Sequence, residues 1–191
     1  MIDIRLTLQG TAPLLMHNSR LANPLDPATK ALSKATGKRK KTEDDHAEIA
    51  RLEFLGSLYF DEEIGPYLPG ENLQRALLDA ARMNRRGKDV ERGLFVTTDI
   101  NPLVYTGPRT REALWDDENF RHMASVKVTT SRTMRCRPIF REWATEVEAA
   151  FDPNVLDMGD IEGMAERSGL YIGLCDWRPR YGRFQVEVEK A

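Results

Sequence analysis

The sequence contains few of the residues that form metal sites and disulfides. Among its 191 residues there are only two cysteines, Cys136 and Cys175, and three histidines, His17, His46 and His122. They are scattered, without the Cys-x-x-Cys or His-x-x-x-His spacings that are typical of zinc sites. We therefore expect no metal, no other cofactor and two reduced thiols.

The chain also lacks a long apolar run. No stretch approaches the roughly 18 apolar residues that a membrane-spanning helix needs. No short basic segment followed by an apolar one stands at the N-terminus, as it would in a secretory leader. The sequence therefore predicts a cytoplasmic protein that does not contact a membrane.

A large net charge is absent as well. The 28 Lys and Arg residues and the 30 Asp and Glu residues leave a formal net charge of −2. Affinity for a polyanion must therefore come from a local concentration of basic side chains. The shares of hydrophobic residues, 41%, and of charged residues, 30%, are those of a folded protein. The length predicts a single domain over residues 1–191.

Strict alternation of apolar and polar residues predicts a strand at each end of the chain. The first strand places four apolar residues on one face: Ile2, Ile4, Leu6 and Leu8. Residues 184–189 repeat this design. Two further strands are expected, one at 125–137, which includes Thr129 and Thr130, and one at 143–151. We expect these two to pair as an extended antiparallel hairpin.

Helical spacing predicts three helices. The first begins at the capping residue Thr42 and runs to about residue 55. The second follows Pro69-Gly70, with the stripe Leu73, Leu77, Ala80 and Asn84 on one side and Arg75, Arg82 and Arg86 on another. The third covers residues 160–167 and ends at Gly169.

Two segments are expected to be insertions in the domain. Residues 19–42 include KALSKATGKRKK, which holds six basic residues and no acid, and this pattern predicts a mobile basic loop. Residues 94–122 form the second insertion, with short strands within 94–105 and no clear pattern over 108–122.

The order of these elements is strand, helices, strands, helix, strand, with one apolar face per strand. Helices on one face of an antiparallel sheet make an α+β fold of the ferredoxin-like (RRM-like) kind, here with loop and hairpin insertions. The other face of the sheet is expected to stay open.

Three landmarks of the chain resemble the RAMP superfamily, the ferredoxin-like RNA-binding backbone-type subunits of CRISPR effector complexes. The first landmark is the N-terminal strand. The second is the YLPGENLQRALLDAAR helix start, in which Pro69, Gly70, Asn72, Leu73 and Arg75 match the family pattern. The third is the loop before the last strand, in which Gly173, Tyr181, Gly182 and Arg183 match. CDWRP stands where the family usually has further glycines.

The resemblance implies a function in antiviral defence as an RNA-binding subunit. Such a subunit grips single-stranded guide RNA by its phosphates, and its partners are the other subunits of a ribonucleoprotein complex. The resemblance also implies head-to-tail self-assembly along the strand, a heterologous contact. DNA stays open as the ligand, because no motif identifies a contact to the 2′-hydroxyl.

Apart from Asn18, the candidate nucleic-acid-binding residues are basic or aromatic. Basic side chains displace counterions from phosphates, and an exposed tryptophan stacks on an unpaired base. The alternatives are a solvated loop, surface ion pairs and a buried tryptophan. The candidates are His17, Asn18, Lys38, Arg39, Lys40, Lys41, Arg75, Arg132, Arg135, Arg137, Trp177, Arg178 and Arg180, with Arg141 expected on the same strand face as Arg135 and Arg137.

Catalysis has two candidate residues. The resemblance implies that an acid in the loop after the first strand can cleave target RNA, and Asp26 lies in that region. It also implies that a histidine can process guide RNA, and His17 is the nearest one. An Asp beside a proline is also a common turn former, so we expect a protein without catalytic activity.

The sequence thus leads to one preferred function and two alternatives. The preferred one is a non-catalytic single-stranded RNA-binding subunit. The first alternative is an endoribonuclease of the same superfamily. The second is a virus-encoded interaction protein that uses the fold to bind a partner complex and has little affinity for RNA.

Overall fold

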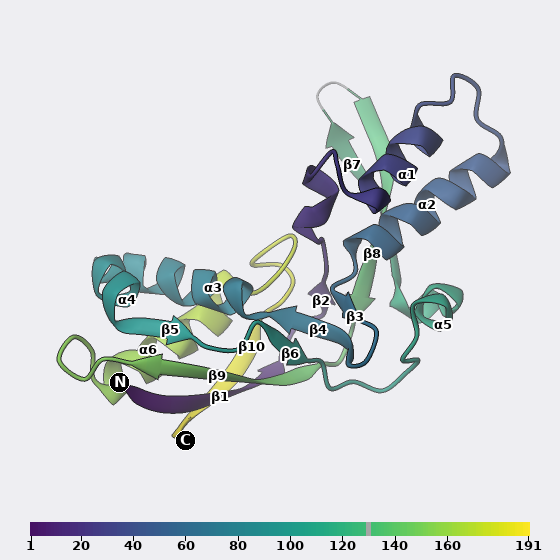
Figure 1. Ribbon diagram of the computed structural model, residues 1–191. Helices are drawn as coiled ribbons and strands as arrows, with labels where there is room; N and C mark the ends of the chain where they lie inside the picture. The colour runs from purple at the N-terminus through teal and green to yellow at the C-terminus, as the bar shows by residue number, and fades with distance from the viewer. Residues whose placement is uncertain (129–130) are drawn as a thin grey trace. The chain divides into compact units, whose positions relative to one another are not determined.

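The chain forms two compact units in the computed structural model, which describes residues 1–128 and 131–191 (Figure 1). Unit 1 consists of Met1–Leu14, Asp61–Thr106 and Phe140–Ala191, and unit 2 consists of Leu15–Phe60 and Gly107–Ile139. Each unit is therefore assembled from segments that are far apart in the sequence. A single folding domain over 1–191 stays a prediction.

Unit 1 contains an antiparallel sheet with the strand order β10-β1-β9-β5. Its strands are β1 (Ile2–Gly10), β5 (Leu94–Val96), β9 (Ala144–Phe151) and β10 (Phe184–Lys190). Helices α3 (Gly70–Met83) and α6 (Met158–Arg167) follow β1 and β9 in the chain and lie over one face of the sheet (Figure 1). This order and connectivity are ferredoxin-like, so the predicted α+β fold class is confirmed.

Smaller elements complete unit 1. They are β4 (Gly65–Pro69), α4 (Gly87–Gly93), β6 (Ile100–Pro102) and the π-helical turn η3 (Ser168–Ile172). Strand β4 pairs with β6 in a second sheet of order β3-β4-β6. The two-residue strands β2 (Leu14–Leu15) and β3 (Phe60–Asp61) lie where the chain passes from one unit to the other.

The alternation of β1 builds the core of unit 1. Ile4, Leu6 and Leu8 are fully buried, and each stabilises the fold by about 1.5–3 kcal/mol through the loss of apolar surface to water. Trp143, just before β9, is buried with them, and its indole N–H donates to the carbonyl oxygen of Ala12 at 2.9 Å. The predicted inward face of the first strand is confirmed.

The Pro69-Gly70 pair opens α3 as predicted. A Cβ atom on Gly70 would lie 2.1 Å from the carbonyl oxygen of Thr98, so only glycine fits there. Leu73, Leu77 and Ala80 are fully buried, as their spacing predicts. Asn84, the last residue of the predicted stripe, lies just beyond the end of the helix and is not part of its buried side.

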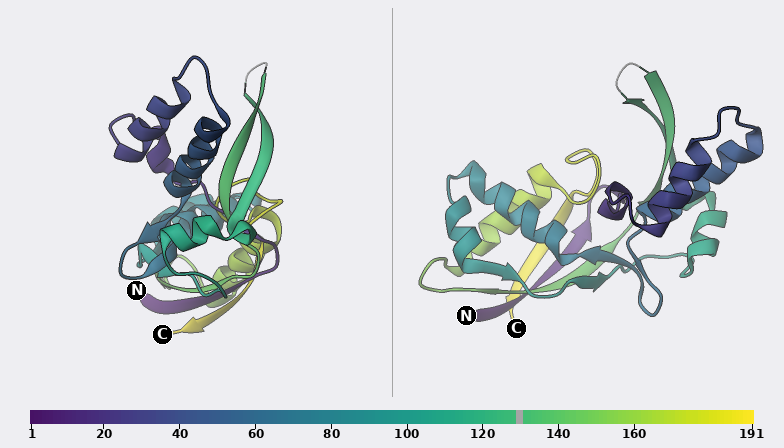
Figure 2. Two further views of the ribbon diagram at one scale, coloured as in Figure 1. Left: turned by 90° about the vertical axis from the view of Figure 1, so that its right-hand side faces the viewer. Right: turned by 45° about the horizontal axis from the view of Figure 1, so that its top comes forward.

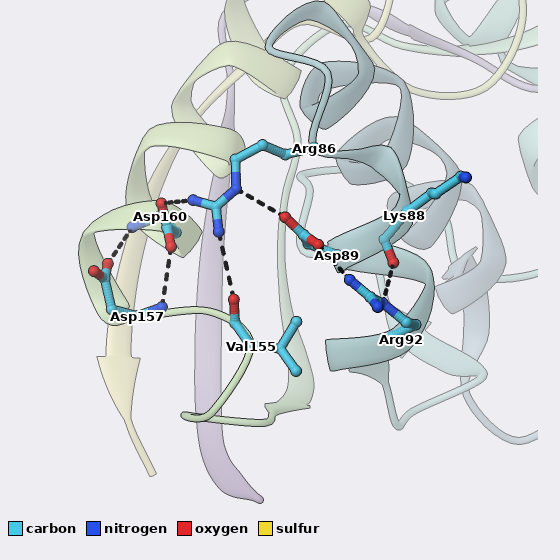
Figure 3. A network of polar contacts seen from close by, with 7 residues as sticks. All are labelled: Arg86, Lys88, Asp89, Arg92, Val155, Asp157 and Asp160. Carbon is cyan, nitrogen blue, oxygen red and sulfur yellow. Dashed lines mark hydrogen bonds and ion pairs between the residues drawn. The ribbon is translucent and has the colours of Figure 1, made fainter.

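Arg86 does not share a helix face with Arg75, because it lies in the turn between α3 and α4. Figure 3 shows its guanidinium between two acids. Its Nε donates to Asp89 at 3.1 Å, its Nη1 pairs with Asp160 of α6, and its Nη2 donates to the carbonyl oxygen of Val155 at 3.4 Å. The hydrogen bond with Asp89 raises the pKa of Arg86. Arg86 therefore joins the α3–α4 turn to the start of α6.

Unit 2 combines helices with a β-hairpin. Its elements are η1 (Ser19–Ala22), α1 (Pro27–Thr36), α2 (Glu43–Ser57), α5 (Arg111–Asp116), η2 (Glu118–Phe120), β7 (Arg121–Val128) and β8 (Ser131–Phe140), the last residue of which belongs to unit 1. Helices α1 and α2 pack on each other, and β7 pairs with β8 (Figure 2). Thr42 caps α2 as predicted, in a capping box with Asp45.

The predicted mobile loop at 19–42 is wrong over much of its length. Residues 27–36 form α1, because Asp26 caps its N-terminus, Pro27 stands at its first position, and Ala and Lys favour the helix. Only a short connection between α1 and α2 is left as the basic loop.

The predicted pairing of strands 125–137 and 143–151 is also wrong. The first of these regions is itself a hairpin, in which Val128 of β7 pairs with Ser131 of β8, and Thr129 and Thr130 lie outside the described residues. The second region is β9, which pairs with β1 and β5. Because Val128 pairs with Ser131, odd-numbered residues of β7 share a face with even-numbered residues of β8, so a single parity followed through 125–137 cannot reveal the turn.

Candidate nucleic-acid interface

The two units carry opposite net charges. Unit 2 has 15 basic and 10 acidic residues, a net charge of +5. Unit 1 has 13 basic and 20 acidic residues, a net charge of −7. The near-neutral total therefore hides a separation of charge that favours unit 2 as the place where a polyanion binds.

The hairpin β7–β8 of unit 2 carries basic residues without acidic ones. From Phe120 to Arg141 the sequence has no acidic residue. Lys127 and Arg132 lie directly opposite each other across the two strands, and both are exposed. Among the residues that the structure describes, neither has an acidic partner. Like charges opposite each other in a ladder repel, and an anion placed between them relieves the repulsion.

Two exposed methionines lie on the same face of the hairpin as this pair. Met123 and Met134 are 50% and 54% exposed, and both have the strand parity of Lys127 and Arg132. A flexible, polarisable side chain beside a phosphate site offers an apolar surface for an unstacked base. Sequence reasoning missed Lys127, Met123 and Met134, because odd-numbered residues of β7 share a face with even-numbered residues of β8 and only the turn between the strands brings them together.

On the opposite face of β8, two arginines contact residues of α2. Arg135 pairs with Glu53, whose side chain is only 2% exposed, and the second carboxylate oxygen accepts the N–H of Cys136 at 3.0 Å. Arg137 lies 3.5 Å from the hydroxyl of Ser57. Arg135 and Arg137 share a face of β8 as predicted, whereas Arg132 lies on the face that carries Lys127. Burial raises the pKa of the Cys136 thiol to about 11, so it stays protonated at neutral pH.

Arg141 does not belong to this face. It follows the last residue of β8 and lies in unit 1, so the predicted group of three arginines is reduced to two. The predicted end of the strand at residue 137 is wrong, because Pro138 lies within β8 and the strand continues to Phe140. At the base of the hairpin Arg121 pairs with Glu118 at 3.1 Å and lies over the ring of Trp115.

The connection between α1 and α2 holds the four predicted basic residues. Lys38 pairs with Asp45, and Lys41 donates to the carbonyl oxygen of Lys38 at 2.8 Å. Arg39 and Lys40 are exposed, and in the described part of the chain neither pairs with an acid. Two of the four cations are thus used within the fold, and two are available to a ligand.

The contact between Lys38 and Asp45 predicts a titration that can be measured. The hydrogen bond from Lys38, followed by that from the Thr42 backbone, lowers the pKa of Asp45 from 3.8 to about 2. Its carboxylate therefore stabilises unit 2 above pH 4, and this contribution disappears as the pH falls toward 2. We expect Lys38→Ala to move the midpoint of Asp45, followed by NMR, back toward 3.8. Lys40→Ala, the control, should leave it unchanged.

Both catalytic candidates have structural contacts. Asp26 accepts the N–H of Ala28 at 2.8 Å as the cap of α1, and it accepts hydrogen bonds from Arg20 at 3.0–3.2 Å, which lower its pKa. His17 is exposed, with Nδ1 3.4 Å from the hydroxyl of Ser57. Asn18 caps η1 by accepting the N–H of Arg20 at 3.0 Å. The role of Asp26 as an ionised cap explains its place beside Pro27.

The remaining candidates form a separate surface in unit 1. Asp79 on α3 pairs with Arg75 at 3.0 Å and with Arg178 at 3.8 Å, so the loop from Gly173 to Arg183 is tied to that helix. In the loop, Trp177 is 37% exposed and its ring centre lies 6.1 Å from that of Tyr181. The structure thus brings Arg75, Trp177, Arg178 and Arg180 together, in a different unit from the other candidates.

Two backbone positions set the shape of this loop. Gly173 and Gly182 have φ angles of +74° and +71°, a region that glycine adopts without strain. Cys175 accepts a hydrogen bond from the side chain of Asn72 at 3.4 Å, and burial raises its pKa to about 12. Arg180 lies over the ring of Tyr181, with 5.8 Å between the guanidinium carbon and the ring centre. The loop therefore presents cations and aromatic rings, but no reactive thiolate.

The open face of the four-stranded sheet is acidic. It carries Asp3, Glu146, Glu148, Glu187 and Glu189, with Arg5 as its basic residue within the strands. Sheets of this fold class often bind RNA on their open face, but here the carboxylates would repel phosphates. The candidate interfaces for nucleic acid are therefore the hairpin of unit 2 and the loop of unit 1.

Residues 1–128 and 131–191 contain neither a metal-binding cluster nor a membrane-spanning helix. Within these ranges no group of three His, Cys, Asp or Glu side chains could hold a metal ion. No helix in the same part of the chain is both long and apolar enough to cross a bilayer.

Comparisons with known proteins reveal a structural likeness. No protein-family model matches the chain, and no curated protein matches it. The structure resembles a chain in the cryo-EM structure of the type III-B Cmr-beta bound to cognate target RNA, with a TM-score of 0.51 and 11% sequence identity. The match covers 99% of this chain and 61% of that chain. At this identity the likeness is one of fold, and it is consistent with the α+β fold class that the sequence predicted.

Proposed function

We propose that this protein binds single-stranded RNA as a subunit of a CRISPR-type ribonucleoprotein complex, without cleaving it. The observation that carries the proposal is the exposed pair Lys127 and Arg132, opposed across the hairpin of unit 2 with no acidic partner in the described residues. A phosphate between the two side chains would replace a repulsion with two charge-assisted hydrogen bonds. The RNA-bound state of the structural neighbour supports RNA as the ligand.

The neighbouring residues extend this contact. Met123 and Met134 provide an apolar surface for bases beside the phosphate site, and Arg39 and Lys40 add exposed positive charge in the same unit. Trp177 and Arg180 in unit 1 form a second surface of the same chemistry. With two such surfaces one copy can hold several nucleotides, and further copies would follow head to tail along the strand.

Neutralising the hairpin pair is the direct test. We expect Lys127→Gln with Arg132→Gln to weaken binding of a single-stranded RNA by about tenfold near 0.1 M salt, because two phosphate contacts are lost. The slope of log affinity against log salt should fall by about 1.4, at about 0.7 for each phosphate. Fluorescence anisotropy with protein freed of nucleic acid measures both quantities.

The matched control is Lys88→Gln with Lys190→Gln, which removes the same charge from exposed positions of unit 1. It should bind RNA as the unchanged protein does. An equal loss in both variants would mean that only total charge matters, and the proposed site would be wrong. Sedimentation of the protein on RNAs of increasing length checks the head-to-tail assembly, since the bound mass should rise by one copy at a time.

A further inference from the structure

The outer edge of β10 is an unpaired strand edge. β10 is the end strand of its sheet, with β1 as its partner. Next to the strand, Thr11 donates its N–H to the carbonyl oxygen of Arg183 at 2.8 Å, and Ala191 donates to Asp3 at 3.0 Å. Because bonded and non-bonded residues alternate in an antiparallel ladder, the odd-numbered residues face β1. The N–H and C=O groups of Phe184, Val186 and Val188 therefore point outward.

Part of this edge is covered and part is open. A Cβ atom on Gly169 would lie 2.1 Å from the carbonyl oxygen of Phe184, so η3 closes the beginning of the edge. Within the described residues, no element pairs with the outward groups of Val186 and Val188. The open stretch is long enough for a short segment of another chain.

A groove of about 940 Å³ runs along this open edge. Its walls carry four carboxylates, from Glu162 and Glu166 on α6 and from Glu187 and Glu189 on β10, and no lysine or arginine lines it. None of the four acids takes part in an ion pair in the described structure. Val186, Val188 and Leu170 supply the apolar part of the lining, and Leu170 is 49% exposed.

These features select the chemistry of a ligand. The carboxylates repel nucleic acid and attract basic side chains, and the acidic open face of the same sheet extends this field. The outward backbone groups suit an added strand, whose main chain supplies hydrogen bonds while alternate side chains enter the walls. An extended polypeptide with basic residues satisfies both requirements.

We propose that the outer edge of β10 binds an extended, basic segment of a partner protein by strand addition. The partner's main chain pairs with Val186 and Val188, its basic side chains meet the four glutamates, and its apolar side chains cover the valines and Leu170. This binding goes beyond the proposed RNA contact, and it uses residues of unit 1 that do not take part in that contact.

A fluorescent peptide of eight alternating lysines and valines is the probe, with the full-length protein in fluorescence anisotropy. We expect Glu162→Lys with Glu166→Lys to weaken binding by about tenfold, since two exposed charge pairs become repulsive. Glu187→Gln with Glu189→Gln, which keeps the strand geometry, should weaken it several-fold. Glu63→Lys with Glu142→Lys, which changes exposed acids away from the groove, should leave binding unchanged.

The backbone contribution has its own control. The same peptide with alternate amides N-methylated keeps its charge but cannot add as a strand, and it should bind at least tenfold more weakly. Equal binding of the two peptides, or an equal loss of affinity in the groove and control variants, would overturn the proposal. The glutamates would then serve to prevent pairing of this edge with other strands. The protein alone could instead form oligomers that dissociate at high salt and that Glu162→Lys with Glu166→Lys abolishes. This result would overturn the proposal and assign the edge to a second copy of the chain. The groove and control variants should bind RNA with equal affinity. A negative result with the peptide would therefore contradict the strand-addition proposal without contradicting the proposed RNA site.

Discussion

Replacing Glu53 with alanine is expected to destabilise the folded protein by about 3 kcal/mol, because it leaves two groups without their partner. The side chain of Glu53 is 2% exposed, pairs with Arg135 and accepts the backbone N–H of Cys136 at 3.0 Å. Its loss leaves a partly buried guanidinium and an unpaired backbone donor. The carboxylate thus holds β8 against α2, and the hairpin that carries the candidate RNA site depends on it.

Urea unfolding followed by circular dichroism measures this effect. The control is Glu48→Ala in the same helix, where the acid is 52% exposed and lies 3.9 Å from Arg51, and its cost should be under about 0.5 kcal/mol. Combining Glu53→Leu with Arg135→Met should recover the part of the loss that comes from the unpaired charge. A cost for Glu53→Ala as small as that of the control would show that the pair does not hold the hairpin.

Substituting Gly182 with alanine is expected to cost about 3 kcal/mol and to open the loop between Gly173 and Arg183. Its φ angle of +71° strains a residue with a Cβ atom, and that atom would lie 2.0 Å from the carbonyl oxygen of Leu174. The clash would break two backbone hydrogen bonds: the carbonyl oxygen of Gly182 accepts from Leu174 N–H at 2.9 Å, and its N–H donates to the carbonyl oxygen of Pro13 at 2.8 Å. Trp177 and Arg180 would lose their positions.

The matched change is Gly159→Ala in the first turn of α6. A Cβ atom there has its nearest neighbour at 3.4 Å, and alanine favours a helix by up to about 1 kcal/mol, so this variant should be neutral or more stable. The same unfolding measurement compares the two. If Gly182→Ala were as stable as Gly159→Ala, the glycine of the loop would have no structural requirement.

Local patterns in the sequence predicted part of the structure well. The alternation of Ile4, Leu6 and Leu8 placed β1 and its buried face, and Thr42 placed the start of α2. Pro69-Gly70 placed the start of α3, where the packing against Thr98 explains the glycine. In each case the residues that determine the structure lie within a few positions of one another, so their spacing carries the information.

Other features depend on contacts between distant segments, and there the predictions were incomplete or wrong. One local signal was also missed, because the basic residues suggested a mobile loop at 19–42 where Asp26 and Pro27 begin a helix. The even parity through 125–137 concealed a hairpin, so Lys127 was not seen to face Arg132. Glu53 was not among the predicted site residues, and only the packing of β8 on α2 buries it.

By itself, the sequence determined the α+β composition, the apolar faces of the terminal strands and the glycines that its turns require, because periodicity and backbone conformation are local properties. Only the tertiary structure decided which strands pair, that basic and acidic residues separate into two units, and that β10 has an open acidic edge. The physical reason is that pairing, burial and the electrostatic field depend on distances in space. Residues as far apart in the chain as Ala12 and Trp143 are neighbours in the structure, and the order of the residues does not show it.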